Sequence, residues 1–343
     1  MNINKTFKAA VMLKQNDTPA LSINDLYDVE PEFGQVKVQM ISSGLCGAQV
    51  NEMTGVKGID KYVPHLMGHE GYGVVTSVGQ EVKKVKPGDH IILHWRPSEG
   101  LEVFGGSYTD INGLKIGSGP VTTFSEITIV SENRCTIVKP TEIMQLVYPL
   151  LGCALPTAYG AITKEAKTKK NDSVFIFGAG GLGMALLFWC KVLGIKSVTV
   201  ADIHNDKESQ VNELGGRFIH IDEIRESKEV YDSIFETTGY HKNVSKSLDI
   251  ANKKSKIVLI GQTRINQEVT FNNFLKFYDG IQLISSQGGL FNPDEDMQTL
   301  CDYIEANQDL ALKLVSHEIQ LEEINEGFDF MKLPDARRVI ITF

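Results

Sequence analysis

The sequence predicts an α/β protein that joins a doubly wound parallel sheet to a β-rich, barrel-like unit. Three observations support this fold class. The first 150 residues contain short alternating strands, strands and helices alternate from about Thr157 onward, and a glycine-rich turn links the first strand of that second part to its helix. The length of 343 residues agrees with about two domains.

The first part of the chain contains short segments in which apolar and polar residues alternate. Val36–Ser42 alternates as a half-buried strand does. Gly73–Gly79 is also typical of a strand that ends in a turn, and the pair Pro87–Gly88 predicts a turn before the apolar run Ile91–Leu93. Short strands at this regular spacing are typical of a β-barrel.

The second part alternates between apolar strands and helical stretches, which places consecutive strands parallel in one sheet. Its predicted strands are Val174–Phe177, Ser197–Ala201, Asp232–Glu236 and Lys256–Ile260. The C-terminal end returns to the first pattern. There we expect a short strand at Ile319–Leu321, an amphipathic segment at Glu322–Met331 and a final strand at Arg338–Phe343.

These patterns predict a discontinuous first domain whose last piece comes from the C-terminus. We expect residues 1–153 and 288–343 to form a catalytic domain and residues 154–287 to form a dinucleotide-binding domain. The glycine-rich turn lies at the start of this second domain and has three recurring glycines. Gly178 allows the tight turn, Gly180 allows the backbone to approach a pyrophosphate, and Gly183 allows the helix to pack closely on the strand.

The same turn predicts a Rossmann dinucleotide site and the identity of its ligand. The helix N-terminus offers free N–H groups to phosphates, so Gly181 and Leu182 join the three glycines as expected cofactor contacts. Asp202 follows Gly183 by nineteen residues and ends the next strand, where an acid hydrogen-bonds a ribose 2′-hydroxyl. A carboxylate there repels a 2′-phosphate, so we expect NAD rather than NADP.

The composition excludes several classes of protein. A formal net charge of −9 argues against a nucleic-acid-binding surface. The richest apolar stretch, Met184–Ile195, contains Lys191 and is too short to span a membrane, so it is interpreted as a buried helix. The five cysteines are scattered and the first residues lack an apolar signal segment, so we expect a cytoplasmic protein with reduced thiols.

Three residues in glycine-containing loops are candidate metal ligands. They are Cys46, His69 and Cys153. Two thiolates and an imidazole form a soft donor set that suits Zn²⁺, and two thiolates balance the charge of the ion. Spacing alone leaves the choice open, because each cysteine could be a buried small residue and His69 could be an ordinary loop histidine.

The order of these motifs resembles the zinc-dependent medium-chain alcohol dehydrogenases over nearly the whole chain. The matching stretches are Gly44–Gly47, Gly68–Val75, Val85–His90, Thr123–Glu126, Leu151–Cys153, Thr157–Gly160, the glycine-rich turn and Ile324–Phe328. The resemblance implies that the β-rich unit is GroES-like and that Cys46, His69 and Cys153 hold one catalytic zinc.

The resemblance also implies roles for other residues. Glu70 matches an acid that can approach the metal, and Thr157 matches a residue beside the nicotinamide. Lys207 matches a residue at the adenosine ribose, and Arg338 matches one near the pyrophosphate. Trp95 matches an aromatic wall of the substrate pocket, although a core aromatic is an equal alternative.

Two departures of the chain from this family bear on its metal content and on its proton route. Many relatives carry a four-cysteine structural zinc lobe, but no cysteine lies between Cys46 and Cys135, so we expect no structural zinc. The segment Pro97–Val121 replaces the lobe and is interpreted as a surface loop or part of a subunit contact. The second departure is Ala48, where relatives usually have a serine or threonine that carries the alcohol proton.

Ala48 therefore leaves the proton route open. Ala48, His94 and Trp95 are the expected lining of the substrate pocket, and Asn51 occupies the place of a relay histidine in some relatives. Loss of a positioned proton-transfer group typically costs about 10²–10⁴-fold in rate. Water together with a pocket acid is the expected substitute, and the candidate side chains are Glu52, Glu70 and His94. The alternatives are slow turnover and a different chemistry.

The sequence thus predicts a zinc-dependent oxidoreductase that transfers hydride between an alcohol or polyol and NAD(H). One alternative is a sugar or cyclitol dehydrogenase of a carbohydrate-biosynthesis pathway, whose substrate supplies the missing hydroxyl. Another is a degenerate protein that binds the dinucleotide without turnover. The expected partners are a small-molecule substrate and further copies of the chain, as a dimer or tetramer, with no nucleic acid or membrane.

Overall fold

The computed structural model describes residues 5–56, 58–141, 143–225 and 228–343 and divides into two compact units. The first unit comprises Met1–Cys153, Asn292–Leu333 and Arg338–Phe343, and the second comprises Ala154–Phe291 with Pro334–Arg337. The sequence placed Pro334–Arg337 in the catalytic domain. In the structure this short segment packs with the second unit, where Lys207 Nζ donates to the Ala336 carbonyl at 2.5 Å.

A mixed sheet forms the centre of the first unit. Among the described residues, its strands lie in the order β10, β6, β5, β3, β18 and β17, and β9 also pairs with β3. Their bounds are β3 Gln35–Gly44, β5 Glu70–Val78, β6 His90–His94, β9 Ile127–Ser131, β10 Cys135–Ile137, β17 Val315–Gln320 and β18 Arg338–Thr342. Because β18 pairs antiparallel with β3, the C-terminal strand completes the sheet that the N-terminal segment begins.

Smaller elements complete the first unit. A second sheet has the order β2, β1, β4, with β1 Thr6–Met12, β2 Ser22–Tyr27 and β4 His65–Leu66, and β7 Tyr108–Thr109 pairs with β8 Lys115–Ile116. The α-helices are α1 Gly47–Met53, α6 Pro293–Ala306, α7 Gln308–Leu312 and α8 Ile324–Phe330. The 3₁₀ turns are η1 Glu132–Arg134, η2 Ile143–Leu146, η3 Tyr148–Gly152 and η8 Leu321–Glu323.

The segment 97–121 packs into the first unit. It contains the β7–β8 hairpin, and the ring of Tyr108 is buried edge-on against Phe7, with ring centroids 5.6 Å apart. The Tyr108 hydroxyl accepts a hydrogen bond from the Ile129 N–H at 2.9 Å. The segment is therefore anchored in the β-rich core through Tyr108 instead of forming only a surface loop.

The second unit is built on a parallel sheet with the order β13, β12, β11, β14, β15, β16 among the described residues. This is the strand order of a doubly wound dinucleotide-binding sheet. Strands are added first on one side of the first strand, β11, and then on its other side. The strands are β11 Ser173–Phe177, β12 Ser197–Asp202, β13 Arg217–His220, β14 Tyr231–Glu236, β15 Ala251–Leu259 and β16 Gln282–Ser285. The predicted fold class is confirmed.

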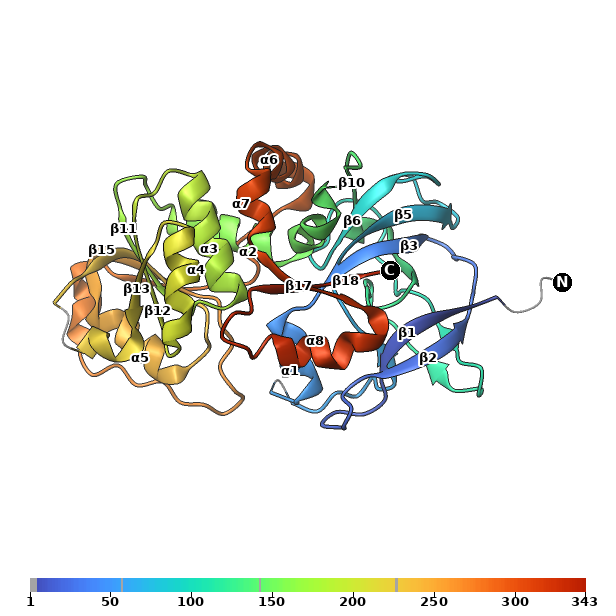
Figure 1. Ribbon diagram of the computed structural model, residues 1–343, viewed down its shortest axis with the longest axis horizontal. Coiled ribbons are helices and arrows are strands. Elements are labelled where there is room, and N and C mark those ends of the chain that lie inside the picture. The colour runs from blue at the N-terminus through green and yellow to red at the C-terminus, as the bar shows by residue number, and fades with distance from the viewer. Residues whose placement is uncertain (1–4, 57, 142, 226–227) are drawn as a thin grey trace. The chain divides into compact units, whose positions relative to one another are not determined.

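Helices cover this parallel sheet, and Figure 1 shows α3 and α4 beside its strands. The α-helices are α2 Ala154–Gly160, α3 Gly181–Val192, α4 Glu208–Glu213 and α5 His241–Asp249. The other helical segments are the π-helix η4 Ala161–Ala166 and the 3₁₀ turns η5 Asn205–Lys207, η6 Ile221–Arg225 and η7 Phe274–Asp279. The expected buried helix at Met184–Ile195 corresponds to α3, whose Trp189 is buried and donates to the Leu155 carbonyl at 2.8 Å. Within the described residues, the helices are too short or too polar to cross a membrane.

Candidate metal centre and dinucleotide site

Three side chains from separate segments of the first unit converge on one point. Cys46 caps the N-terminus of α1, His69 lies in the turn before β5, and Cys153 directly follows η3. One ligand atom from each of these residues lies within 4.8 Å of the other two. Two thiols and an imidazole at this separation fit a Zn²⁺ ion with one open coordination position.

Glycines allow the ligand loops to approach closely. Gly68, directly before His69, has a φ of +92°, a left-handed conformation that favours glycine. A Cβ on Gly152, directly before Cys153, would lie 2.3 Å from the Leu93 carbonyl oxygen. Larger residues at either position would displace the neighbouring ligand, so the glycines seen in the sequence are a requirement of this geometry.

The Cys46 thiol differs electrostatically from the structural cysteines. Its hydrogen bond with Cys153 is the largest cause that lowers the pKa of Cys46 well below its usual value, followed by His69 and the charge of Arg338. Burial instead raises the pKa of Cys190 and of Cys301 to about 12. Thiolate character therefore concentrates at the candidate metal centre, as metal binding requires.

A buried ion pair lies behind the metal centre. The Arg338 guanidinium on β18 donates to Glu70 Oε1, and both residues are almost completely buried. Burial is the largest cause that lowers the pKa of Arg338, while the Cys46 thiolate opposes that effect. The structure thus places Arg338 against Glu70 and Cys46 within the first unit, whereas its expected pyrophosphate contact stays a prediction.

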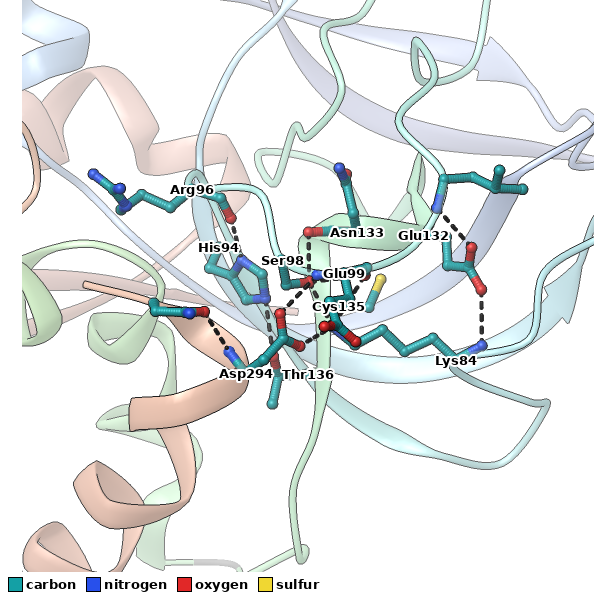
Figure 2. Close-up of polar contacts among 12 residues, drawn as sticks. Lys84, His94, Arg96, Ser98, Glu99, Glu132, Asn133, Cys135, Thr136 and Asp294 are labelled. Atoms are coloured by element: carbon teal, nitrogen blue, oxygen red, sulfur yellow. Dashed lines mark hydrogen bonds and ion pairs between the residues drawn. The ribbon is translucent and has the colours of Figure 1, made fainter. Parts of the chain in front are cut away.

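The expected pocket residues have different environments. His94 is fully buried, and Figure 2 shows its ring between the Arg96 carbonyl and the Thr136 hydroxyl, at 2.7 and 3.0 Å. Burial lowers the pKa of His94 to about 4. Both ring nitrogens of His94 are therefore engaged with neighbouring groups of the first unit, and its place in the substrate pocket stays a prediction.

The backbone of Trp95 bonds to the residue that precedes the candidate metal ligand Cys153. Its N–H donates to the Gly152 carbonyl at 3.3 Å, next to Cys153, and its half-buried ring has the Arg96 guanidinium 5.6 Å from the centroid. The ring is therefore not part of the fully buried core. The expectation of a substrate contact stays a prediction.

The first turn of α1 carries Ala48, which is half-buried and offers no hydroxyl. One helical turn later, the Glu52 carboxylate lies 3.9 Å from His65 Nε2, which also lies 2.9 Å from Asp60 Oδ2. These three side chains form a second group of potential ligands, which the sequence analysis did not identify. The His65–Asp60 contact also ties the segment that follows α1 back to β4.

Gln49, the residue that follows Ala48, was not predicted from the sequence to contact the metal ligands. In the structure its side chain is fully buried, its Oε1 accepts the Cys46 N–H at 2.9 Å, and its Nε2 lies 2.5 Å from His69 Nδ1. The signal in the sequence was its position three residues after Cys46, where a side chain can reach back to the N-cap of a helix.

The glycine-rich turn in the second unit has the geometry of a phosphate cradle. Gly178 has a φ of +94°, and a Cβ on Gly183 would lie 1.8 Å from the Gly178 carbonyl oxygen. A Cβ on Gly180, the N-cap of α3, would meet no atom within 4 Å. The space in front of the helix N-terminus is therefore open to a ligand, and Gly181 and Leu182 in the first turn are half-buried.

Apart from Arg338, which belongs to the first unit, the remaining predicted cofactor residues also belong to the second unit. Asp202 ends β12 and accepts hydrogen bonds from the N–H groups of Ala179 and His204 at 2.8 and 3.0 Å, which orients its carboxylate at the glycine-rich turn. Lys207 is buried, and burial lowers its pKa although Asp202 has the opposite effect. Thr157 is buried in α2.

Comparisons with known proteins agree with this arrangement. The chain matches the Alcohol dehydrogenase GroES-like domain over residues 32–140 and the Zinc-binding dehydrogenase family over residues 181–306. It is 25% identical to Alcohol dehydrogenase 6 of Peromyscus maniculatus, with 97% of each chain covered.

Solved structures share the fold over the whole chain. An alcohol dehydrogenase zinc-binding domain protein from Burkholderia ambifaria superposes with a TM-score of 0.87 at 21% identity, with 99% of each chain covered. Benzyl alcohol dehydrogenase from Acinetobacter calcoaceticus gives a TM-score of 0.84 at 19% identity, again with 99% of each chain covered. With the two family matches and the site geometry, the chain belongs to the zinc-dependent medium-chain dehydrogenase family.

Proposed function

We propose that this protein is an oxidoreductase that uses one zinc ion per chain to transfer hydride between an alcohol or polyol and NAD(H). The convergence of the ligand atoms of Cys46, His69 and Cys153 within 4.8 Å carries the proposal. A bound Zn²⁺ supplies Lewis-acid chemistry that lowers the pKa of an alcohol and so favours loss of hydride from its carbon.

The residues of this chain hold the reacting groups in place. Two thiolates balance the ionic charge, and the Glu70–Arg338 ion pair adds no net charge beside Cys46. In the second unit, the open turn at Gly180 binds the phosphates and the Asp202 carboxylate accepts hydrogen bonds from the ribose hydroxyls. A carboxylate at that place supports NAD(H) over NADP(H).

Proton release follows a route that avoids residue 48. Three side chains are candidates for this route. Glu70 is buried in its ion pair, and both ring nitrogens of His94 are engaged in hydrogen bonds. The Glu52 side chain, in contrast, is 41% exposed. Glu52 follows Ala48 by four residues and so lies on the same face of α1. We therefore propose that water and Glu52 carry the proton to solvent.

A polyhydroxylated substrate is the second candidate, because a hydroxyl of the substrate itself could occupy the space that Ala48 leaves without a hydroxyl. A sugar or cyclitol substrate would use the same metal and cofactor. The two candidates therefore differ in substrate profile and not in site residues.

The test is a metal analysis joined to a substrate screen. We expect one zinc per chain, and NAD⁺ reduction with members of a panel of simple alcohols, polyols and sugars, followed by absorbance of the reduced nicotinamide. Bound zinc without turnover on any class, with dinucleotide binding intact, would instead favour the non-catalytic binding protein. Glu52→Gln should shift the pH–rate profile more than Glu70→Gln, and unchanged profiles in both variants would exclude the two acids.

A further inference from the structure

Glu52, Asp60 and His65 form a group of potential metal ligands that shares no residue with the candidate zinc centre. Glu52 lies on α1, Asp60 lies in the loop that follows this helix, and His65 lies on β4. One ligand atom of each residue lies within 4.8 Å of the other two. His65 is only 9% exposed, so the group joins a buried imidazole to two carboxylates and is more than a cluster of surface acids.

The ring of His65 is oriented towards the two carboxylates. Its Nδ1 contacts the Leu66 carbonyl oxygen at 2.7 Å, and its Nε2 lies 2.9 Å from Asp60 Oδ2 and 3.9 Å from Glu52 Oε1. In metal-binding histidines, the ring nitrogen that does not bind the ion usually contacts a backbone carbonyl or a carboxylate, which fixes the ring. His65 therefore already has the orientation that a cation ligand needs.

A glutamine outside the group holds two of its segments together. Gln15 Nε2 donates to the Glu52 carbonyl, and Gln15 Oε1 accepts the Asp60 N–H, both at 2.8 Å. Asp60 Oδ1 accepts the Tyr62 N–H at 2.7 Å, while Asp60 Oδ2 faces His65. Asp60 is therefore held against α1 by contacts that do not use the oxygen nearest to His65.

The spacing of these atoms fits a small octahedral cation. When the ligand atoms lie about 2.1 Å from such a cation, neighbouring ligand atoms are about 3 Å apart. The distance of 2.9 Å between His65 Nε2 and Asp60 Oδ2 agrees with this value. The Glu52 side chain is 41% exposed, so it has room to move closer and leaves a path for the ion and its water ligands. Two carboxylates also balance the charge of a divalent ion.

We infer that Glu52, Asp60 and His65 bind one divalent first-row transition-metal ion such as Mn²⁺, in addition to the zinc of the proposed function. Carboxylates and water suit Mn²⁺, and an imidazole favours a first-row transition ion over Mg²⁺ or Ca²⁺. The thiolates of the zinc centre are soft donors, which Mn²⁺ does not prefer. The two sites therefore select different ions through the chemistry of their ligands.

Occupancy of this second site has a consequence for turnover, and this consequence rests on the proposed function. Glu52 is the side chain that we propose to carry the proton to solvent. A cation bound to its carboxylate holds it beside His65 and favours the charged form, so Glu52 accepts a proton less readily. A divalent cation at this site therefore slows turnover without replacing the zinc ion.

The first experiment titrates the full zinc-loaded chain with Mn²⁺ and follows free Mn²⁺ by electron paramagnetic resonance. We expect saturable binding of one Mn²⁺ per chain, and binding at least about tenfold weaker in His65→Gln and in Asp60→Asn. Asp17→Asn removes an exposed carboxylate from the same unit and should leave the affinity unchanged. Absence of Mn²⁺ binding, or equal affinity in all four proteins, overturns the inference and leaves the proposed function intact.

A second measurement uses only the natural protein and needs no variant to fold. Pulsed electron paramagnetic resonance of the bound Mn²⁺ should show coupling to one imidazole nitrogen. Coupling to oxygen ligands alone would place the ion on surface carboxylates and would overturn the site, whatever the affinities show.

The third measurement tests the consequence for turnover. Saturating Mn²⁺ should lower NAD⁺-linked turnover of the natural protein about tenfold or more, because a positioned proton-transfer group is lost. The same concentration should leave the turnover of His65→Gln unchanged. Mn²⁺ binding with no effect on turnover contradicts the role of Glu52 but not the cation site, whereas zinc-loaded protein without turnover before Mn²⁺ is added contradicts the proposed function.

Discussion

The candidate metal centre and the glycine-rich turn of the proposed dinucleotide site are assembled in opposite ways. The turn and Asp202 come from one continuous stretch, β11 to the end of β12, and they present backbone N–H groups and a single carboxylate. The metal centre takes Cys46, His69 and Cys153 from three segments, and a fourth segment supplies the supporting Arg338. One site depends on local backbone shape, and the other depends on side chains that only the folded first unit brings together.

This contrast predicts which changes each region tolerates. In the dinucleotide turn, an added Cβ at Gly183 would collide with the Gly178 carbonyl oxygen, so the absence of side chains is the requirement. At the metal centre the chemical groups themselves are the requirement. Variants in one region should therefore leave the function of the other intact, and the first of the four predictions below tests that independence directly.

Removal of a metal ligand should have the largest effect. Cys153→Ala should lower NAD⁺-linked turnover by about 10³-fold or more, because the ion contributes several kcal/mol of charge stabilisation. Dinucleotide affinity, measured by calorimetry, should stay within about twofold, since the glycine-rich turn is in the second unit. Cys190→Ala is the matched control, and turnover that survives in Cys153→Ala would show that this thiol does not hold the catalytic ion.

Disruption of the buried ion pair should destabilise the first unit. Arg338→Met leaves the Glu70 carboxylate buried without its cation, which typically costs about 3–5 kcal/mol in the free energy of unfolding. Urea unfolding of the metal-free protein measures this loss of stability. In a Trp189→Phe background, Trp95 is the one remaining tryptophan, so its fluorescence follows the first unit. The double variant Arg338→Met/Glu70→Leu should recover much of the loss, and equal loss in both would refute the charge argument.

Acid should weaken the first unit through His94. Its pKa is about 4 when folded and near 6.5 when unfolded, so the unfolded chain binds the proton more readily. The stabilising contribution is complete above about pH 6.5 and declines as the pH falls towards 4, by roughly 3 kcal/mol in total. The free energy of unfolding of His94→Gln should depend less on pH between 4 and 6.5 than that of the natural protein. The same pH dependence in both proteins would exclude His94 as the cause.

The smallest expected effect concerns the choice of cofactor. Asp202→Ser removes a carboxylate that repels the 2′-phosphate of NADP⁺, and this repulsion is worth about 1 kcal/mol when bulk water screens the two charges. The ratio of kcat/KM for NADP⁺ to that for NAD⁺ should rise roughly fivefold to tenfold. Asp206→Ser on η5 is the control, and an unchanged ratio in Asp202→Ser would mean that this acid does not select the cofactor.

Much of the fold followed from periodicity, because strands buried on both faces have apolar sequences. The structure has β11, β12, β14 and β15 at the predicted apolar runs, and α8 within the predicted amphipathic segment. The strands β13 and β16, which are the edges of the parallel sheet, were not predicted from the sequence. Both are only partly buried, so their sequences lack the apolar continuity that identified the central strands.

The site residues also divide into those with a local sequence signal and those without one. Cys46, His69 and Cys153 were predicted from motifs with flanking glycines, and the structure brings them together. His94 was expected in the pocket, yet Arg96 and Thr136 engage both of its nitrogens. No local pattern in the sequence distinguishes a histidine that faces a cavity from one that bonds to a neighbouring strand.

The shape of the glycine-rich turn is encoded locally, because a strand, a turn with three glycines and a helix fold through contacts within about 30 residues. The partners of the candidate metal ligands, in contrast, follow from long-range packing. The ion pair of Glu70 with Arg338 joins residues 268 positions apart, and the contact of Gln49 with His69 crosses from α1 to the turn before β5. Such contacts depend on how sheets and loops pack, since the chain carries no local signal for residues that meet only after it has folded.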